Sequence, residues 1–196
     1  MQADLASETE TSRLVAAAAT ALGGPLDLLV NNASVFEPDA AQDHTREQWD
    51  LHMQVNLRAP ILLAQGFAAQ LPANARGCIV NMLDQRVWKL NPEFFTYTLS
   101  KSALWSATQT LAQGLAPRIR VNAIGPGPTL RNARQSDDDF AKQVEATLTG
   151  EGASTEEIVR ALTYLIEASA VTGQMIAVDG GQHLIWQTPD VVGVKE

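Results

Sequence analysis

The sequence predicts a doubly wound α/β fold, in which helices cover both faces of a parallel β-sheet. The first observation is a set of short segments that are rich in β-branched residues and apolar on both faces, as is typical of buried parallel strands. These segments are residues 26–32, 78–83, 119–125 and 174–179. The second observation is that amphipathic helical patterns stand between them, and this alternation is typical of a parallel sheet.

The expected helices carry start signals. Three of them begin with Ser or Thr followed three residues later by Glu or Gln, the spacing of a capping box. These pairs are Ser7 with Glu10, Thr45 with Gln48, and Ser154 with Glu157. The first helical pattern stops at the pair Gly23 and Gly24, the second reaches about Leu71, and residues 95–116 form a further helix.

Length and composition indicate a single globular domain over residues 1–196. Hydrophobic residues make up 45% of the chain and charged residues 18%, which is a globular profile. The net charge of −8 argues against a nucleic-acid partner, which requires a basic face. No apolar run approaches the roughly 20 residues that cross a bilayer, so no membrane partner is expected.

Cysteine and histidine usage bounds the compartment and the chemistry. The single cysteine, Cys78, cannot form an internal disulfide, and the N-terminus has no signal-peptide pattern, so a cytoplasmic location is expected. His44, His52 and His183 are scattered and give no metal-ligand spacing, so no metal is expected.

The loops after the expected strands share one composition. They read NNASVFEP, LDQRVWKL, GPGPTLRN and GGQHLIWQ, and each is rich in Gly, Pro, Asn or other polar residues. Ligands bind at the carboxyl ends of the strands in open parallel sheets. Strand ends always lead into loops, but four such loops at one edge favour a binding site there.

Tyr97 and Lys101 lie one helical turn apart, so their side chains share a face of the expected helix. A free tyrosine has a pKa of about 10, and a nearby ammonium lowers it by stabilising the phenolate. Such a tyrosine can act as an acid or base near neutral pH. The spacing alone also arises often by chance.

An ordered set of motifs gives this pair its context. LLVNNAS, VNLRAP, IVNM, YTLSK, IRVNAIGPGP and VTGQMIAVDGG follow one another, and nearly the whole chain resembles the short-chain dehydrogenase/reductase family. The resemblance implies a Rossmann-like fold and an NAD(P)-dependent oxidoreductase. It implies that Tyr97 is the catalytic acid/base and that Lys101 lowers its pKa and holds the nicotinamide ribose. It also implies that Asn56 anchors a relay water, with a locally satisfied polar residue as the alternative.

The resemblance also implies a cofactor-binding set. Its members are Asp4, Leu5, Asn31, Asn32, Ala33, Tyr97, Lys101, Pro126, Gly127 and Thr129. In this set Asp4 and Leu5 flank the adenine, the NNA turn passes the adenosine and ribose, and the PGPT turn carries the carboxamide. The cofactor is NADPH or NADH, and NADPH is the better match to the branch described next.

Asp84 stands thirteen residues before Tyr97, where most of the family has a serine that donates to a substrate carbonyl. An ionised carboxylate has no proton to donate, and it raises the pKa of a neighbouring phenol. It therefore suits a substrate that presents an N–H group or a protonatable ring nitrogen. The alternative is a carboxylate that caps a helix or loop in a degraded site.

The pteridine reductase and dihydromonapterin reductase branch has this aspartate, and the NNASVFEP segment resembles that branch as well. The resemblance implies that Phe36 stacks on a pterin ring and that Ser34 bonds the substrate or the cofactor. An aromatic platform suits a flat heteroaromatic ring. The substrate-binding set is thus Ser34, Phe36, Asp84 and Tyr97. Taken alone, Phe36 is equally an ordinary apolar loop residue.

The glycine-rich strand and turn that normally open the family do not precede the first expected strand. We therefore expect an N-terminally truncated domain that lacks its first two βα units, with residues 26–32 as an apolar sheet edge. A fragment and a genuine short form that no longer binds dinucleotide are both open.

Three functions remain open at this point: reduction of a pterin-like C=N bond, oxidoreduction of a carbonyl or alcohol, and a non-catalytic scaffold. The expected partners are a small-molecule substrate and further copies of the chain. The family often forms dimers or tetramers through the helices near residues 45–71 and 95–116.

Overall fold

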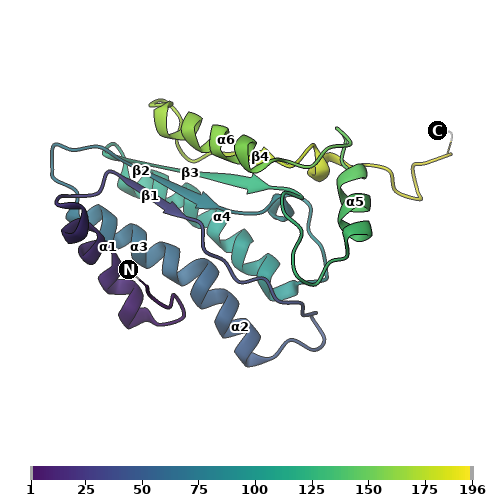
Figure 1. The fold of residues 1–196 in the computed structure, drawn as a ribbon, viewed down its shortest axis with the longest axis horizontal. Coiled ribbons are helices and arrows are strands. Elements are labelled where there is room, and N and C mark those ends of the chain that lie inside the picture. The colour runs from purple at the N-terminus through teal and green to yellow at the C-terminus, as the bar shows by residue number, and fades with distance from the viewer. Residues whose placement is uncertain (1, 195–196) are drawn as a thin grey trace.

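The computed structural model describes residues 2–194, which form one parallel sheet with helices on both of its faces (Figure 1). The strands are β1 (Leu28–Asn31), β2 (Gly77–Met82), β3 (Ile119–Pro126) and β4 (Met175–Val178). They pair in parallel in the order β1-β2-β3-β4. The predicted doubly wound α/β architecture is confirmed, and all four strands lie where the sequence places them.

Helices cover both faces of the sheet (Figure 1). The helices are α1 (Glu8–Leu22), α2 (Arg46–Met53), α3 (Ala59–Gln70), α4 (Phe95–Leu115), α5 (Asp137–Glu145) and α6 (Thr155–Glu167). The π-helical segment η1 (Gln54–Arg58) joins α2 to α3, and η2 (Gln85–Val87) and η3 (Gln182–Leu184) are short 3-10 turns. α3 and α4 lie against the sheet with α1 packed on α3, while α6 covers the opposite face.

Two of the three predicted capping boxes form completely. Thr45 and Gln48 exchange side-chain and backbone hydrogen bonds at the start of α2, and Ser154 does the same with its partner at the start of α6. For the third, the prediction is wrong in one of its two hydrogen bonds. Ser7 accepts from the backbone of Glu10, but the Glu10 carboxylate accepts from the N–H of Asp4 at 2.9 Å. The chain before α1 folds back far enough to compete for that carboxylate.

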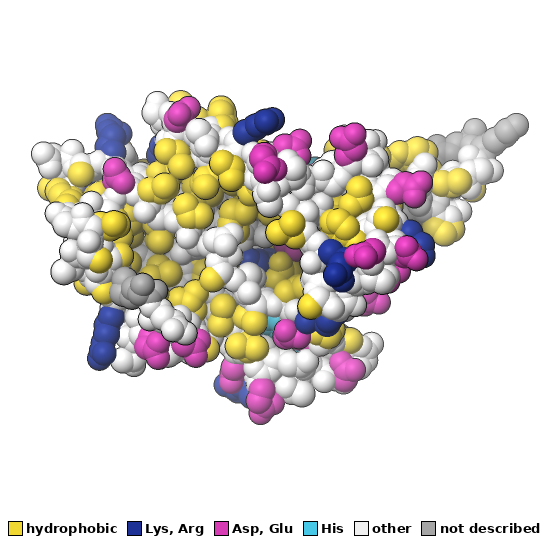
Figure 2. Space-filling model, viewed as in Figure 1, with side chains coloured by type: hydrophobic (Ala, Val, Ile, Leu, Met, Phe, Trp, Pro, Cys, Tyr) yellow, Lys and Arg dark blue, Asp and Glu magenta, His cyan; other side chains and the backbone are white. Residues whose placement is uncertain are grey.

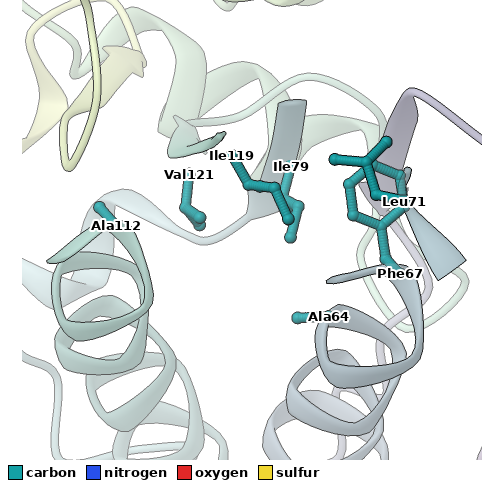
Figure 3. Close-up of a cluster of buried hydrophobic side chains, with 7 residues drawn as sticks. All are labelled: Ala64, Phe67, Leu71, Ile79, Ala112, Ile119 and Val121. Carbon is teal, nitrogen blue, oxygen red and sulfur yellow. The ribbon is translucent and has the colours of Figure 1, made fainter. Parts of the chain in front are cut away.

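The core has one layer on each face of the sheet. Ile79, Ile119 and Val121 point from the strands toward the side chains of α3 and α4, among them Phe67 (Figure 3). Their neighbours in sequence point the other way, and Val80 packs with the apolar side chains of α6. Burial on both faces explains why these strands read as continuous apolar runs.

β1 forms one edge of the sheet, as the sequence predicts for its first apolar segment. Within residues 2–194 it pairs with β2 alone. Leu28 is 37% exposed on this strand, and Figure 2 shows hydrophobic side chains gathered on the side of the molecule where β1 and α6 lie in Figure 1. An apolar sheet edge of this kind is open to pairing with further chain.

Candidate active site

The loops that follow the four strands meet at the carboxyl edge of the sheet and line one cavity of about 490 Å³. Phe36 comes from the loop after β1, Asp84–Arg86 from that after β2, Pro126–Leu130 from that after β3, and Gln182 from that after β4. The convergence of loops that their composition predicts is therefore present, and α5 closes one side of the cavity with Phe140.

Tyr97, Asp84 and Lys101 lie together beside this cavity. The Tyr97 hydroxyl donates a hydrogen bond to Oδ2 of Asp84 at 2.9 Å. Nζ of Lys101 lies 5.8 Å from the centroid of the Tyr97 ring and donates to the carbonyl of Met82, the last residue of β2, at 2.8 Å. Tyr97 and Lys101 are both buried, so the helix face they share is turned toward the sheet.

The electrostatics of the pair follow from this burial. Burial raises the pKa of Tyr97 well above its usual value, the Asp84 carboxylate raises it further, and Arg86 partly offsets the rise. Burial lowers the pKa of Lys101 to about 8, and the charge of Asp84 works in the opposite direction. The pKa of Tyr97 is thus raised and not lowered: burial and Asp84 set the direction, and the cation that opposes them is Arg86 and not the expected Lys101.

Asp84 combines the two roles that the sequence leaves as alternatives. Its Oδ1 accepts from the backbone N–H of Arg86 at 2.8 Å and caps the turn η2. Its Oδ2 accepts a hydrogen bond from the Tyr97 hydroxyl. The cap fixes the carboxylate at the place where it meets the phenol, so capping here serves the site.

Phe36 is the centre of an aromatic cluster at the cavity wall. It stacks on Phe94 with ring centroids 4.1 Å apart and planes 14° apart, and it meets the edge of Tyr97 at 4.7 Å. Arg134 bonds the Phe36 carbonyl and forms an ion pair with Glu37 at 2.9 Å. Phe94 holds a left-handed backbone conformation with φ 60° directly before α4. Phe36 is thus far from an ordinary loop residue.

Asn56 lies in the π-helical segment η1 and uses its whole side-chain amide inside the protein. Nδ2 donates to the Val35 carbonyl and to Ser100, while Oδ1 accepts from the Val35 N–H and from the Ser34 hydroxyl. These four bonds exhaust the capacity of an amide. The side chain therefore fastens the loop after β1 to α4, as in the local alternative, and Ser34 is engaged in the same bonds.

A buried hydrogen-bond chain that sequence reasoning missed also fixes this loop. His52 is fully buried; its Nε2 accepts from the Glu37 N–H at 3.1 Å and its Nδ1 lies 2.6 Å from the Thr96 hydroxyl. The Thr96 hydroxyl in turn donates a hydrogen bond to the Asp39 carboxylate. Burial lowers the pKa of His52. His52 and Thr96 stand 44 residues apart in the sequence, so no local spacing signals this chain.

The PGPT turn lies at the cavity as expected. Pro126, Gly127 and Thr129 all line it, and the Thr129 hydroxyl donates to the Gly127 carbonyl at 3.2 Å. A Cβ on residue 127 would lie 2.6 Å from Cα of Asp179, so only glycine lets the turn approach the end of β4 this closely.

The remaining candidates for the adenosine end do not line the cavity. Asn31 is buried at the end of β1, where its Nδ2 donates to Asn81 and its Oδ1 has no hydrogen-bond donor within residues 2–194. Asn32 and Ala33 are exposed. Asp4 and Leu5 lie ahead of α1, where the Asp4 carboxylate accepts from the backbone of the same turn.

Residues 2–194 contain neither a metal-binding cluster nor a membrane-spanning helix. No cluster of three or more His, Cys, Asp or Glu side chains in this range is arranged to hold a metal ion. No helix in the same range has both the length and the apolar character that crossing a membrane requires.

Comparison with known proteins places this geometry in a family. A family model described as enoyl-(acyl carrier protein) reductase, of the short-chain dehydrogenase/reductase type, matches residues 1–183. The chain belongs to the short-chain dehydrogenase/reductase family. The family resemblance inferred from the ordered motifs is therefore confirmed, together with the Rossmann-like fold that it implies.

Two curated relatives illustrate the range of the similarity. The chain is 38% identical over 172 residues to protein FixR of Bradyrhizobium diazoefficiens, a match that takes in 83% of this chain and 61% of FixR. It is 34% identical over 165 residues to an NAD-dependent glycerol dehydrogenase of Listeria innocua, covering 80% of this chain and 64% of that protein. The chain thus spans less than two thirds of these curated relatives.

A solved structure is more similar still. The crystal structure of FolM alternative dihydrofolate reductase 1 from Brucella canis, complexed with NADP, superimposes with a TM-score of 0.94 at 51% sequence identity. The match covers 98% of this chain and 76% of that one.

Proposed function

We propose that the chain acts as an NADPH-dependent oxidoreductase that reduces a C=N bond in a pterin-like ring. The observation that carries this proposal is the contact between the Tyr97 hydroxyl and the Asp84 carboxylate, beside the aromatic wall formed by Phe36. A carboxylate accepts N–H groups and an aromatic wall accepts a flat ring. The similarity to a dihydrofolate reductase complexed with NADP supports the same substrate class.

Tyr97 is the proton donor in this proposal. Its raised pKa keeps the phenol protonated at neutral pH, which suits a group that gives a proton to a ring nitrogen as the C=N bond is reduced. Lys101, with a pKa of about 8, is mostly charged at pH 7. It is close enough to stabilise the phenolate once the proton has left.

Asp84 and Phe36 orient the ring. The carboxylate accepts an N–H of the substrate while its other oxygen stays on the cap of η2, so its position does not depend on the ligand. Phe36 is held by its stack on Phe94 and by the bonds that the Asn56 side chain makes to the neighbouring loop. A ring that packs on Phe36 therefore meets a wall that is already in place, which favours binding.

The residues present fit a nicotinamide cofactor. The unpaired Oδ1 of Asn31 suits a ribose hydroxyl as its donor. Lys101 lies beside Tyr97, and the turn at Gly127 and Thr129 offers polar groups at the cavity. When bound, the cofactor supplies the hydride. The roles of Asp4, Leu5, Asn32 and Ala33 in holding its adenosine end stay predictions, as does the choice of NADPH over NADH.

Self-association and a cytoplasmic location belong to the same proposal. Leu99 is 36% exposed on α4, one of the helices through which we expect dimers or tetramers to form. Light scattering of the purified chain measures this directly, and a monomer at micromolar concentration contradicts the expectation.

A second candidate is oxidoreduction of a carbonyl or alcohol, which the similarity to a glycerol dehydrogenase favours. NADPH oxidation with a panel of dihydropteridines and ketones separates the two. The pterin proposal predicts turnover of a dihydropteridine, with loss of about a hundredfold or more in Asp84→Ser and Tyr97→Phe. Asp138→Ser removes an exposed acid of α5 outside the cavity and serves as the control. Turnover of ketones alone contradicts the pterin proposal.

A further inference from the structure

Arg86 presents a buried donor that nothing within residues 2–194 accepts. Its NH1 atom is buried and has no hydrogen-bond partner in this range. The guanidinium carbon lies 5.0 Å from the ring centroids of both Phe36 and Phe94, and the residue lines the cavity. Buried polar groups without partners are rare, and those on charged side chains are especially unfavourable, so such a group at a cavity points to a ligand.

The position of Arg86 is set by Asp84. The Asp84 carboxylate accepts the backbone N–H of Arg86 at 2.8 Å, so the two side chains leave the same turn into the same cavity. Arg86 is also near enough to Tyr97 to oppose the rise of its pKa. The site therefore holds an acceptor-only group, Asp84, and a donor-only group, Arg86, near the phenol.

The other arginine at the cavity is already paired. Arg134 forms its ion pair with Glu37 and bonds the Phe36 carbonyl. Its neighbour Arg131 pairs with Asp137 and does not line the cavity. Arg86 is thus the cavity arginine whose NH1 has no acceptor within residues 2–194.

We propose that Arg86 is a substrate-binding residue that donates a hydrogen bond to a ring oxo group, next to the ring N–H that Asp84 accepts. The ligand class is a heteroaromatic lactam, in which N–H and C=O stand side by side. This inference rests on the proposed function. It adds which groups of the ring the site recognises, namely the oxo group and the neighbouring N–H. A ring with an amino group in place of the oxo group presents a donor to Arg86, and two facing donors disfavour binding.

The test compares a 2-amino-4-oxopteridine with the corresponding 2,4-diaminopteridine, both titrated in the presence of NADPH. Tryptophan fluorescence reports binding, since Trp88 follows Arg86 by two residues. The diamino ring also lacks the ring N–H that Asp84 accepts, so the wild-type ratio reports both residues. Asp84 is unchanged in every Arg86 variant, so a change in the ratio from wild type to variant reports Arg86. We expect Arg86→Met to shift this ratio toward the diamino ring by about tenfold to a hundredfold, the effect of one hydrogen bond from a charged donor.

Two matched variants sharpen the result. Arg131→Met removes a neighbouring charge outside the cavity and keeps the wild-type ratio. Arg86→Gln retains a side chain that both donates and accepts, so it moves the ratio in the same direction as Arg86→Met while keeping affinity for both rings. Each ratio is taken within one preparation, so partial unfolding of a variant does not alter it.

Either of two results overturns the inference. A ratio that stays at the wild-type value in both Arg86 variants refutes the role of Arg86, and turnover of dihydropteridine by the wild type then leaves the proposed function standing. A wild-type chain that binds neither ring in the presence of NADPH refutes both.

Discussion

The hydroxyl of Tyr97 lies 2.9 Å from the carboxylate of Asp84, and the second oxygen of that carboxylate is fixed by the backbone of Arg86. The acid that influences the phenol is therefore held by the fold and does not depend on a flexible side chain. Because Asp84 can only accept in this contact, the phenol keeps its proton. Burial of Tyr97 acts in the same direction.

Asp84→Asn tests this relationship. The amide preserves the shape of the carboxylate and removes its charge, so the pKa of Tyr97 falls, by on the order of one unit for a single neighbouring charge. Near-UV absorbance during alkaline titration measures phenolate formation. The chain has two tyrosines, so the titration uses a Tyr164→Phe background, in which an exposed residue of α6 has been removed. An unchanged titration of Tyr97 contradicts a direct influence of Asp84.

Lys101 makes stability depend on pH in the alkaline range. Its pKa falls from 10.5 to about 8 on folding, so between these values the unfolded chain binds more protons than the folded one. The free energy of unfolding therefore gains a contribution that rises with pH from about 8. Tyr97 opposes this near pH 10, because its raised pKa lets the folded chain keep a proton that the unfolded chain loses.

Urea unfolding at several pH values below 10 measures this contribution. Lys101→Met removes it, so the difference in free energy of unfolding between wild type and variant grows with pH. Lys142→Met, which removes an exposed lysine of α5, keeps the wild-type slope. Equal slopes in wild type and Lys101→Met refute the lowered pKa.

His52 is predicted to stabilise the loop that carries Phe36. His52→Leu keeps an apolar side chain of similar size but leaves the Glu37 N–H without its acceptor. We expect a loss of about 1–3 kcal/mol in the free energy of unfolding, and a larger effect on KM for the substrate than on the chemical step. His52→Gln, which can still accept and donate, recovers part of the loss.

The same histidine gives a dependence in the acid range. The pKa of His52 is lowered in the folded chain. Below a pH of about 6.5, His52 therefore binds a proton in the unfolded chain while it stays neutral in the folded chain. Stability therefore falls as the pH falls through this region. Comparing the pH slope of wild type with that of His52→Gln isolates the effect from that of the carboxylates. A slope that survives in the variant assigns it to another group.

Gly127 and Gly114 form a matched pair for the packing of the PGPT turn. Gly127→Ala places a methyl group 2.6 Å from Cα of Asp179, so the turn must move away from β4. We expect a loss of roughly 1–3 kcal/mol. In Gly114→Ala, on an open surface of α4, we expect a gain of up to about 1 kcal/mol. Denaturant midpoints of the two variants measure the contrast, and equal shifts argue against the close approach.

The order of strands and helices could be predicted because burial on both faces leaves continuous apolar segments and capping residues mark helix starts. The pairing of Tyr97 with Lys101 could be predicted from their helical spacing, and the family resemblance placed Asp84 beside them. The balance of their effects could not. It depends on how deeply Tyr97 is buried, and the burial of a side chain in the first turn of α4 depends on how the surrounding loops pack.

The supporting contacts were also beyond the sequence pattern. The helical period between Thr45 and Leu71 is unbroken, so it gives no sign of the π-helical turn that presents Asn56. The chain from His52 through Thr96 joins segments 44 residues apart, and the free NH1 of Arg86 becomes visible only when every nearby acceptor has been placed.

Phe94 adopts a left-handed backbone conformation that disfavours residues with a Cβ by about 1–2 kcal/mol. Glycine or asparagine would relieve that strain, yet neither would give Phe36 a ring to stack on. Natural or laboratory selection for heat resistance alone would therefore replace Phe94 first among the aromatic residues at the cavity wall. Thermostable variants that lose substrate affinity should be sequenced at codon 94.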